Sequence, residues 1–239
     1  MNLNFINKVY LGITILLAVL IIHKVWAYKS SERFYYYSSV SAPVSFPIHI
    51  NRIDLILPDN ELALGFYKSE LEEVNVFMTK WGKEYYFPEV HEPLRLPLKL
   101  SLDYCDYRSR TFYKDTIDLP QQVLLAAFKK AVKEEQTIEM YSSQGDKFGL
   151  NFVVGIANNG NIVLWLRGKD FEKVIFKKKL HAYEPGAQDL QYERQQFNKQ
   201  SYLDTVFSEL PDSMLTLFKN GYDRSANYID SPSKYLDLK

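Results

Sequence analysis

Residues 148–167 read FGLNFVVGIANNGNIVLWLR, two strongly apolar runs separated by Asn158-Asn159-Gly160. An Asn-Gly pair tolerates a positive φ, which the tight turn of a β-hairpin requires. The two runs therefore predict adjacent strands, Phe148 to Ala157 and Asn161 to Arg167, joined by that turn. Directly after the hairpin, Lys173 to Tyr183 predicts a further strand with a basic face.

Upstream of this hairpin the chain predicts more strands. The clearest is Leu98 to Tyr107, where apolar and polar residues alternate with a period of two. Leu100 and Leu102 share one face of it, and Asp103 and Cys105 share the other. The other predicted strands are Phe34 to Val40, Phe46 to Leu57 with imperfect alternation, Leu71 to Trp81, and Arg110 to Ile117 as the returning partner of Leu98 to Tyr107.

One soluble helix is predicted to begin around Asp118-Leu119-Pro120-Gln121. Asp118 would cap it, Pro120 suits the first turn, and Gln121 takes the capping-box position. Its predicted buried stripe consists of Leu124, Ala127, Phe128, Ala131 and Val132. Residues Gln188 to Tyr222 are predicted to be helical and polar, and the tail from Asp223 onward is predicted to be loose.

The run Val9 to Ile22, VYLGITILLAVLII, predicts a segment that enters a membrane. It is short for a full span, but it reaches Ala27 if Lys24 extends toward the lipid headgroups. The alternative is a cleaved signal peptide, with Val25-Trp26-Ala27 as the cleavage site. The residues predicted to face lipid are Val9, Leu11, Ile13, Leu16, Leu17, Leu20 and Ile22.

These patterns predict an α+β protein, mainly an antiparallel β-sheet domain with one central helix, a C-terminal helical segment and an N-terminal membrane helix. The expected domains are residues 1–29 as the signal-anchor, residues 30–185 as the β-rich domain, and residues 186–239 as a helical extension with a loose tail.

Composition narrows the classes of function. All 29 acidic residues but only 26 of the 29 basic residues follow Lys29, so the domain is mildly acidic and no nucleic-acid partner is expected. The single cysteine, Cys105, excludes an intramolecular disulfide and a multi-cysteine metal site. Eighteen tyrosines and fifteen phenylalanines suit half-buried strands, which must hold the fold together without disulfides.

No catalytic, cofactor-binding or metal site is predicted. His91 lies beside two glutamates but in a proline-rich loop, which favours a solvated loop over a metal site. Cys105 shares a strand face with Asp103, whose charge would raise the thiol pKa, so a structural cysteine is favoured over a nucleophile. The run Phe176 to Lys179 could meet anionic lipid, but a solvated strand face is favoured.

An aromatic cluster in a loop-like region is the candidate protein-binding surface. A plain role in core packing remains open for these residues. The cluster consists of Trp81, Tyr85, Tyr86 and Phe87.

An ordered series of motifs carries a family resemblance. The series is Ser41-Ala42-Pro43, Phe46-Pro47, Trp81-Gly82, Leu96-Pro97, Phe112-Tyr113, Asp118-Leu119-Pro120, Gly155-Ile156-Ala157, and Gly160 to Gly168. It resembles the bacterial domain of unknown function family numbered 2931, from Tyr35 to Ala182. Many relatives carry a lipoprotein cysteine after the signal, which this chain lacks, and their turn reads Pro-Gly-Gly where this chain has Asn158-Asn159-Gly160.

The resemblance implies an envelope protein, because members look like envelope proteins and some resemble immunity proteins encoded beside secreted antibacterial toxins. The family has no agreed enzymatic activity that the resemblance could carry over to this chain. We therefore expect a non-enzymatic, protein-binding protein, anchored by one helix in the bacterial inner membrane with its domain in the periplasm. A structural envelope protein is the alternative, and an unrecognised hydrolase using Asp103 and Asp54 as its carboxylates is a third.

Overall fold

The computed structural model describes residues 4–30, 32–63, 81–83 and 90–233. The chain divides into two compact units, Met1–Arg33 and Phe34–Lys239. The first unit is essentially helix α1 (Phe5–Ser30). Its segment Phe5–Val25 has a mean hydropathy of 2.3 and no buried residues, so by length and composition this helix could cross a membrane. An N-terminal signal sequence would share the same two properties.

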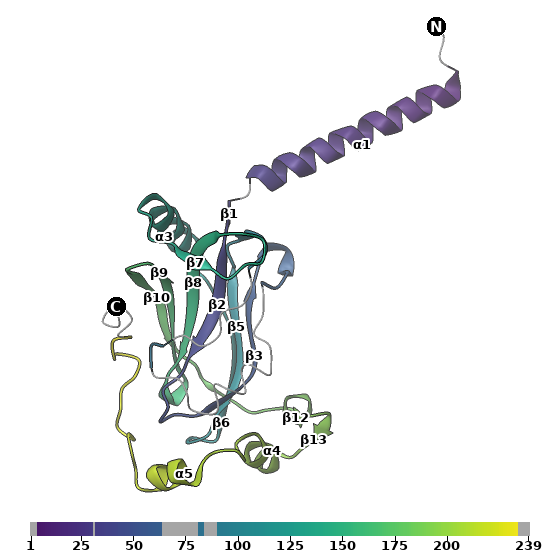
Figure 1. Ribbon diagram of the computed structural model, residues 1–239. Coiled ribbons are helices and arrows are strands. Elements are labelled where there is room, and N and C mark those ends of the chain that lie inside the picture. The colour runs from purple at the N-terminus through teal and green to yellow at the C-terminus, as the bar shows by residue number, and fades with distance from the viewer. Residues whose placement is uncertain (1–3, 31, 64–80, 84–89, 234–239) are drawn as a thin grey trace. The chain divides into compact units, whose positions relative to one another are not determined.

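The second unit contains two main sheets (Figure 1), and the chain is α+β with mostly antiparallel pairing, as predicted. One sheet has the strand order β10-β9-β8-β2, with β7 also paired to β8, and β2 is the strand that runs parallel to its neighbour. Its strands are β2 (Tyr36–Ser41), β7 (Ile138–Met140), β8 (Lys147–Ile156), β9 (Asn161–Gly168) and β10 (Phe171–Lys179).

The other main sheet is antiparallel throughout, in the order β11-β6-β5-β3. Its strands are β3 (Ile48–Ile56), β5 (Lys99–Asp106), β6 (Thr111–Asp118) and β11 (Ala182–Tyr183). The short elements are β1 (Arg33–Phe34), β4 (Leu94–Arg95), β12 (Gln191–Tyr192), β13 (Gln195–Gln196) and the 3-10 turns Pro58–Asn60, Asn158–Gly160 and Ala187–Leu190. The strand predicted at Leu71 to Trp81 lies outside the described residues except for Trp81.

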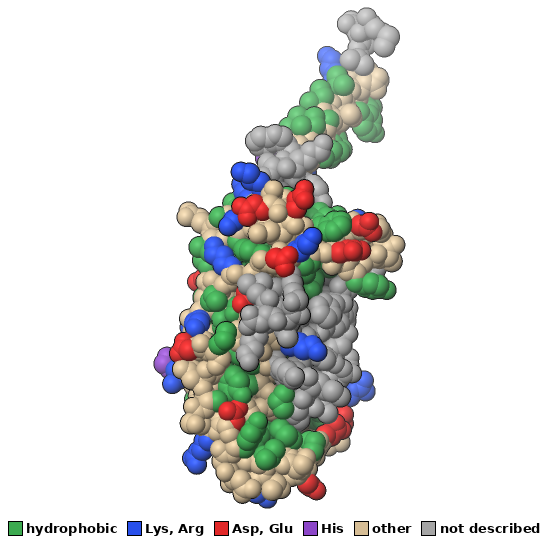
Figure 2. Space-filling view, turned by 60° about the vertical axis from the view of Figure 1, so that its left-hand side comes forward, with side chains coloured by type: hydrophobic (Ala, Val, Ile, Leu, Met, Phe, Trp, Pro, Cys, Tyr) green, Lys and Arg blue, Asp and Glu red, His purple; other side chains and the backbone are tan. Residues whose placement is uncertain are grey.

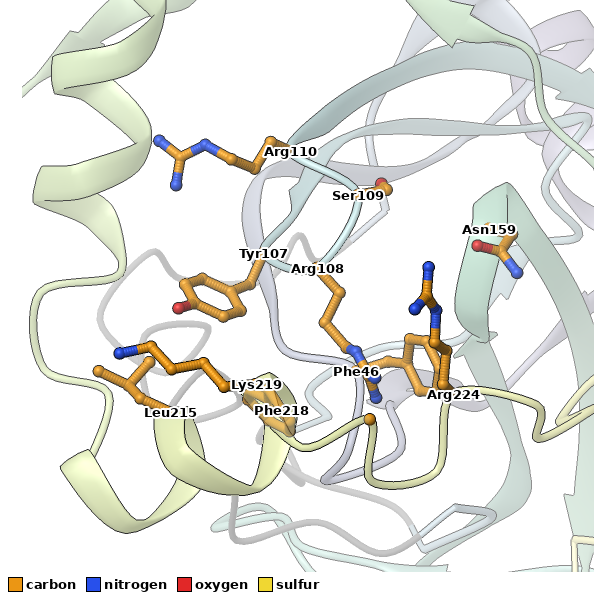
Figure 3. Close-up of a pocket in the computed structure, with 11 residues that line it drawn as sticks. Phe46, Tyr107, Arg108, Ser109, Arg110, Asn159, Leu215, Phe218, Lys219 and Arg224 are labelled. Atoms are coloured by element: carbon orange, nitrogen blue, oxygen red, sulfur yellow. The ribbon is translucent and has the colours of Figure 1, made fainter.

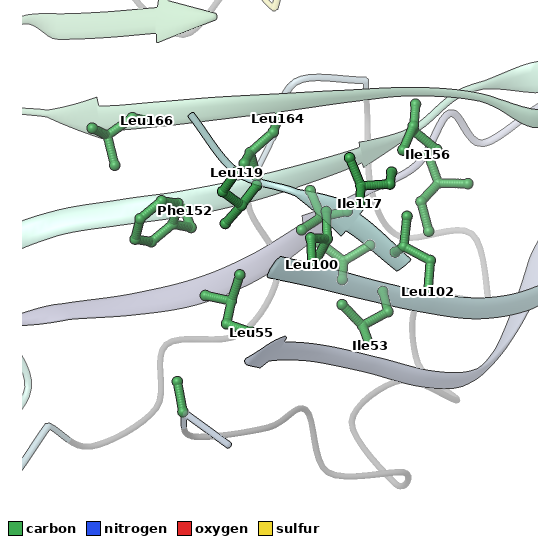
Figure 4. Packing of buried hydrophobic residues seen from close by; sticks show 14 of the residues in the cluster. Ile53, Leu55, Leu100, Leu102, Ile117, Leu119, Phe152, Ile156, Leu164 and Leu166 are labelled. Atoms are coloured by element: carbon green, nitrogen blue, oxygen red, sulfur yellow. The ribbon is translucent and has the colours of Figure 1, made fainter. Parts of the chain in front are cut away.

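The main core lies between the two sheets, whose inward side chains face one another (Figure 4). Alternation places one face of each strand in this core, as in other sheet-on-sheet packings. Leu100 and Leu102 of β5, for example, are fully buried there with Phe152 of β8 and Leu164 of β9. The face of β5 that was predicted to be apolar is therefore the buried one.

The β8–β9 hairpin forms as predicted, with Asn151 to Ile156 paired antiparallel to Ile162 to Arg167. Asn159 and Gly160 both have positive φ, 59° and 76°. At Gly160 a Cβ atom would lie 2.5 Å from the Tyr113 ring, so glycine is needed for space as well as for conformation. The imperfect alternation of β3 also has a structural cause, because a register irregularity occurs between Ile50 and Arg52.

The central helix is α3 (Gln121–Lys133), which buries Leu124, Ala127, Phe128 and Ala131 against the core. Two details of the prediction were wrong. Asp118 does not cap the helix, because it is the last residue of β6 and pairs with Lys99. Val132 is 58% exposed and lies outside the buried stripe.

Helices α4 (Lys199–Val206) and α5 (Asp212–Lys219) lie at the opposite end of the sandwich from α3 (Figure 1). Tyr202 and Leu203 of α4 are buried on the outer face of the β6–β5 sheet, against Cys105 and Phe112. The region from Gln188 to Tyr222 is thus only partly helical, and it packs onto the sandwich.

Residues 223–233 were expected to form a loose tail, whereas in the structure they pack against the sheet that contains β8 and β9. Ile229 contacts the cluster of Val153, Val163 and Trp165 on its outer face. Ser233 donates a hydrogen bond to Glu172, which is the ion-pair partner of buried Arg167 at 2.7 Å. Apolar contacts and buried polar partners therefore hold this polar segment in place.

The basic face of β10 is solvated, as predicted, and its charges are partly neutralised. Lys177 pairs with Asp230 at 3.1 Å, and Lys178 pairs with Asp115 at 2.8 Å. On the face drawn in Figure 2, basic and acidic side chains are mixed over the described surface. Such mixing keeps any one stretch of this face from presenting a strong field of a single sign.

Candidate functional site

Trp81 belongs to the packing of the sandwich. Its ring is half-buried, 5.0 Å from the Trp165 ring and 5.7 Å from the Tyr228 ring, and its Nε1 donates to the carbonyl of Ser231 at 3.3 Å. Tyr85, Tyr86 and Phe87, the other residues of the predicted aromatic surface, lie outside the described residues. A protein-binding role for these three stays a prediction.

Cys105 is a structural residue, as predicted. It is fully buried beneath α4, and this burial raises the pKa of its thiol, with further contributions from the charges of Asp106 and Asp103. A thiol with a raised pKa forms little of the thiolate that reacts as a nucleophile. Asp103 itself forms an ion pair with Lys114 at 3.1 Å.

Alkylation measures this burial directly, because Cys105 is the chain's single thiol. In the folded full-length chain we expect iodoacetamide at pH 8 to modify it at least about tenfold more slowly than a free cysteine, since each unit of raised pKa removes about nine-tenths of the thiolate. In denaturant the same chain should be modified stoichiometrically. Equal rates in the folded and unfolded chains would contradict the burial of Cys105.

Asp54 and Asp103, the two carboxylates of the hydrolase alternative, lie on the neighbouring strands β3 and β5, where Asp54 is in register with Ser101 and Asp103 with Arg52. Asp54 forms an ion pair with Arg52 on its own strand. In the described part of the chain, no group of three or more histidine, cysteine, aspartate or glutamate side chains is placed to hold a metal ion. His49 is buried on β3, and its ring contacts the rings of Tyr192 and Tyr202.

A cationic pocket, which the sequence analysis did not identify, lies between the β5–β6 turn and helix α5 (Figure 3). Its volume is about 640 Å³. Three separate parts of the chain form its walls: the β5–β6 turn, the β8–β9 turn with the segment before β3, and α5 with the residues that follow it. The lining residues are Phe46, Tyr107, Arg108, Ser109, Arg110, Asn159, Leu215, Phe218, Lys219, Gly221 and Arg224.

The first wall is held by Asp106 at the end of β5. Its Oδ1 accepts hydrogen bonds from the backbone N–H groups of Arg108 and Ser109, at 2.6 and 3.1 Å, in the manner of an Asx-turn. Burial raises the pKa of Asp106, although these hydrogen bonds oppose the shift. The turn so formed presents Arg108 and Arg110 to the pocket.

The opposite wall is tied down by Asp223, directly after α5. Its carboxylate accepts hydrogen bonds from the hydroxyl groups of Ser45 and Tyr228. Burial and the hydrogen bond to Asp223 raise the pKa of Tyr228 to about 12, so this phenol stays protonated and continues to donate. The cluster of Ser45, Asp223 and Tyr228 links the C-terminal segment to the loop before β3 and fixes the backbone beside Arg224.

Two of the four cations in the pocket are engaged within the protein. Arg108 donates to the carbonyl oxygens of Ser45 and Tyr222, at 3.2 and 2.8 Å. Its guanidinium also lies 4.6 Å from the centre of the Phe46 ring and 5.1 Å from that of Phe218, which are cation–π distances.

Arg110 is paired with Asp204 of α4 at 2.8 Å. Lys219 and Arg224 differ, because both are exposed and, among the described residues, neither makes an ion pair. These two side chains are therefore available to a ligand.

The pocket's chemistry suits an anionic group flanked by apolar surface. Among the described residues, its lining holds four cations and no carboxylate, and its aromatic walls are Phe46, Tyr107 and Phe218. Sequence reasoning missed it because the lining residues are spread from Phe46 to Arg224. The one local signal was Tyr107-Arg108-Ser109-Arg110, two arginines in the turn between two predicted strands.

Comparison with known proteins finds one family. The model of the family described as "Protein of unknown function (DUF2931)" matches residues 24–225, which include both sheets and the pocket. No curated protein and no solved structure is significantly similar to the chain.

Proposed function

The chain belongs to the DUF2931 family of unknown function, and we propose that it is a membrane-anchored protein of the bacterial cell envelope that binds another protein. In this proposal α1 stays in the inner membrane as an uncleaved single-pass anchor and the sandwich faces the periplasm. The function is binding rather than catalysis. The cationic pocket beside α5, with its three arginines and three aromatic side chains, is the observation that carries the binding part of the proposal.

The anchor part is supported by α1. Its apolar segment Phe5–Val25 contains 21 residues, close to the roughly 20 that a bilayer span requires. Its side chains are exposed, so it contributes no buried surface to the protein itself. Inserting it in lipid removes this apolar surface from water.

The composition of the pocket supports a protein partner. Tyrosine and arginine are enriched at the energetic centres of protein interfaces, and phenylalanine is enriched at interfaces in general. Tyr107, Arg108, Arg110, Phe218 and Arg224 are of these types and converge on one hollow. Several are fixed by contacts within the protein, which lowers the entropic cost of binding.

The most concrete form of the proposal is an immunity protein that blocks a secreted antibacterial toxin in the envelope. Its support is the resemblance of some family members to proteins encoded beside such toxins. Cells that lack this protein should then be killed by sister cells that carry the neighbouring toxin. Unchanged survival of the deleted cells would contradict the immunity form, while the binding proposal would still stand on the next experiment.

Affinity capture of the full-length chain from native membranes tests the binding proposal. We expect one partner in about equimolar amount to be retained after stringent washing, because a specific interface holds a defined stoichiometry. An empty capture would contradict it. Recovery of a mixed assembly of envelope components would favour the alternative, a structural envelope protein.

A further inference from the structure

We propose that the pocket beside α5 receives a carboxylate-bearing, acidic segment of the partner protein, and that Lys219 and Arg224 bind its carboxylates. This inference rests on the proposed function, because it names the chemistry by which the same site recognises its partner. It adds the sign of the charge, the two residues that bind it and the class of segment bound.

The charge balance of the pocket is the first argument. Three aspartates beside the pocket are already engaged: Asp106 by backbone N–H groups, Asp204 by Arg110, and Asp223 by Ser45 and Tyr228. None of them lines the pocket. A cavity whose charged lining residues are all cations, as they are among the described residues here, attracts an anion and repels another cation.

The state of the individual cations is the second argument. Arg108 is held by two carbonyl groups and two aromatic rings, so it serves as a fixed wall. Lys219 and Arg224 are exposed and make no ion pair within the described residues. Arg224 offers the planar fork of donors that matches a carboxylate, and Lys219 adds a compact charge.

The size and the walls of the pocket favour a peptide segment. Its volume of about 640 Å³ lies in the range of pockets that enclose ligands of many atoms. Phe46, Tyr107 and Phe218 provide apolar contact for the carbon atoms beside a carboxylate. An acidic peptide uses both the cations and the rings, whereas a small free anion uses the cations alone.

A direct test uses the full-length chain in nanodiscs of zwitterionic lipid and a fluorescently labelled hexaglutamate peptide, with binding read by anisotropy. We expect hexaglutamate to bind in low salt and a matched hexaglutamine peptide not to bind. In the double variant Lys219→Gln, Arg224→Gln the affinity should fall at least about tenfold, since each substitution removes a charge-assisted contact. Both side chains are exposed, so their loss should leave the melting temperature unchanged.

The matched control is the double variant Lys133→Gln, Lys179→Gln, which removes the same amount of charge from two exposed lysines outside the pocket. It should change the affinity less than twofold. Equal losses in the two double variants, or equal binding of hexaglutamine, would overturn the inference. Displacement of the peptide by inorganic phosphate at lower concentration than by free glutamate would also overturn it, because the site would then be a phosphate site.

The proposed function and this inference can fail separately. A partner captured equally by the wild-type chain and the Lys219→Gln, Arg224→Gln variant would leave the binding function standing and overturn the acidic-segment inference. Binding of hexaglutamate that depends on Lys219 and Arg224, together with an empty membrane capture, would support the chemistry of the pocket and count against a protein partner.

Discussion

Replacing Phe152 with alanine should lower the free energy of unfolding by about 3–5 kcal/mol, the usual cost of emptying a phenylalanine site in a packed core. Phe152 lies on β8 and is fully buried between the two sheets. Its ring is 5.2 Å from that of Tyr36 and 5.8 Å from that of Phe128, so it joins β2, β8 and α3. Because these two neighbours belong to two other elements, the cavity cannot collapse without moving the backbone.

The matched control is Phe148→Ala on the same strand, where the side chain is 53% exposed. Its cost should be within about 0.5 kcal/mol. Denaturant unfolding of the full-length chain in detergent, followed by tryptophan fluorescence, measures both values. Similar losses for the two variants would contradict the placement of Phe152 in the core.

The second large effect concerns the buried charge on β9. Arg167 is completely inaccessible to solvent, and its Nε donates to Glu172 at 2.7 Å. Removing the partner of a buried charge takes away its ion pair, at a cost of about 3–5 kcal/mol. We expect Glu172→Ala to destabilise the chain by this amount. The variant also removes the acceptor of the Ser233 hydroxyl, so residues 223–233 should become more accessible to protease.

Glu184→Ala provides the control, because Glu184 pairs with Lys199 at 2.8 Å but its side chain is 79% exposed. Exposed pairs contribute about 0–1 kcal/mol. If denaturant unfolding gave equal losses for Glu172→Ala and Glu184→Ala, the buried pair would have no special role. Faster proteolysis confined to Glu172→Ala would tie the C-terminal segment to the sandwich through Ser233.

Local patterns were sufficient to predict the longer strands of both sheets and the hairpin, whereas short strands such as β7 were missed. Leu98 to Tyr107 alternates cleanly because β5 has its core face and its outer face in different surroundings. The turn at Asn159-Gly160 could be recognised because a positive φ restricts the residue types that occur there. The helix α3 was recognisable by its buried stripe. Asp118 was misassigned because aspartate is common both at helix N-caps and in the turns that follow strands.

Contacts between distant parts of the chain could not be predicted in the same way. The parallel pairing of Tyr36 with Leu150 joins residues more than a hundred positions apart, and no local signal specifies it. The packing of Ile229 and Ser233 depends on surfaces created by the sheets. The cationic pocket is of the same kind, because Arg108 and Arg224 are neighbours only after the C-terminal segment has crossed the end of the sandwich.

Capture from native membranes with a charge-reversed pocket tests the central claim most directly. The full-length wild-type chain, the variant Lys219→Glu, Arg224→Glu and the control Lys133→Glu, Lys179→Glu would be compared at equal expression. We expect the wild-type chain and the control to retain the same partner in equimolar amount and the pocket variant to retain little of it. Equal retention by all three chains, or no partner with any of them, would contradict the account.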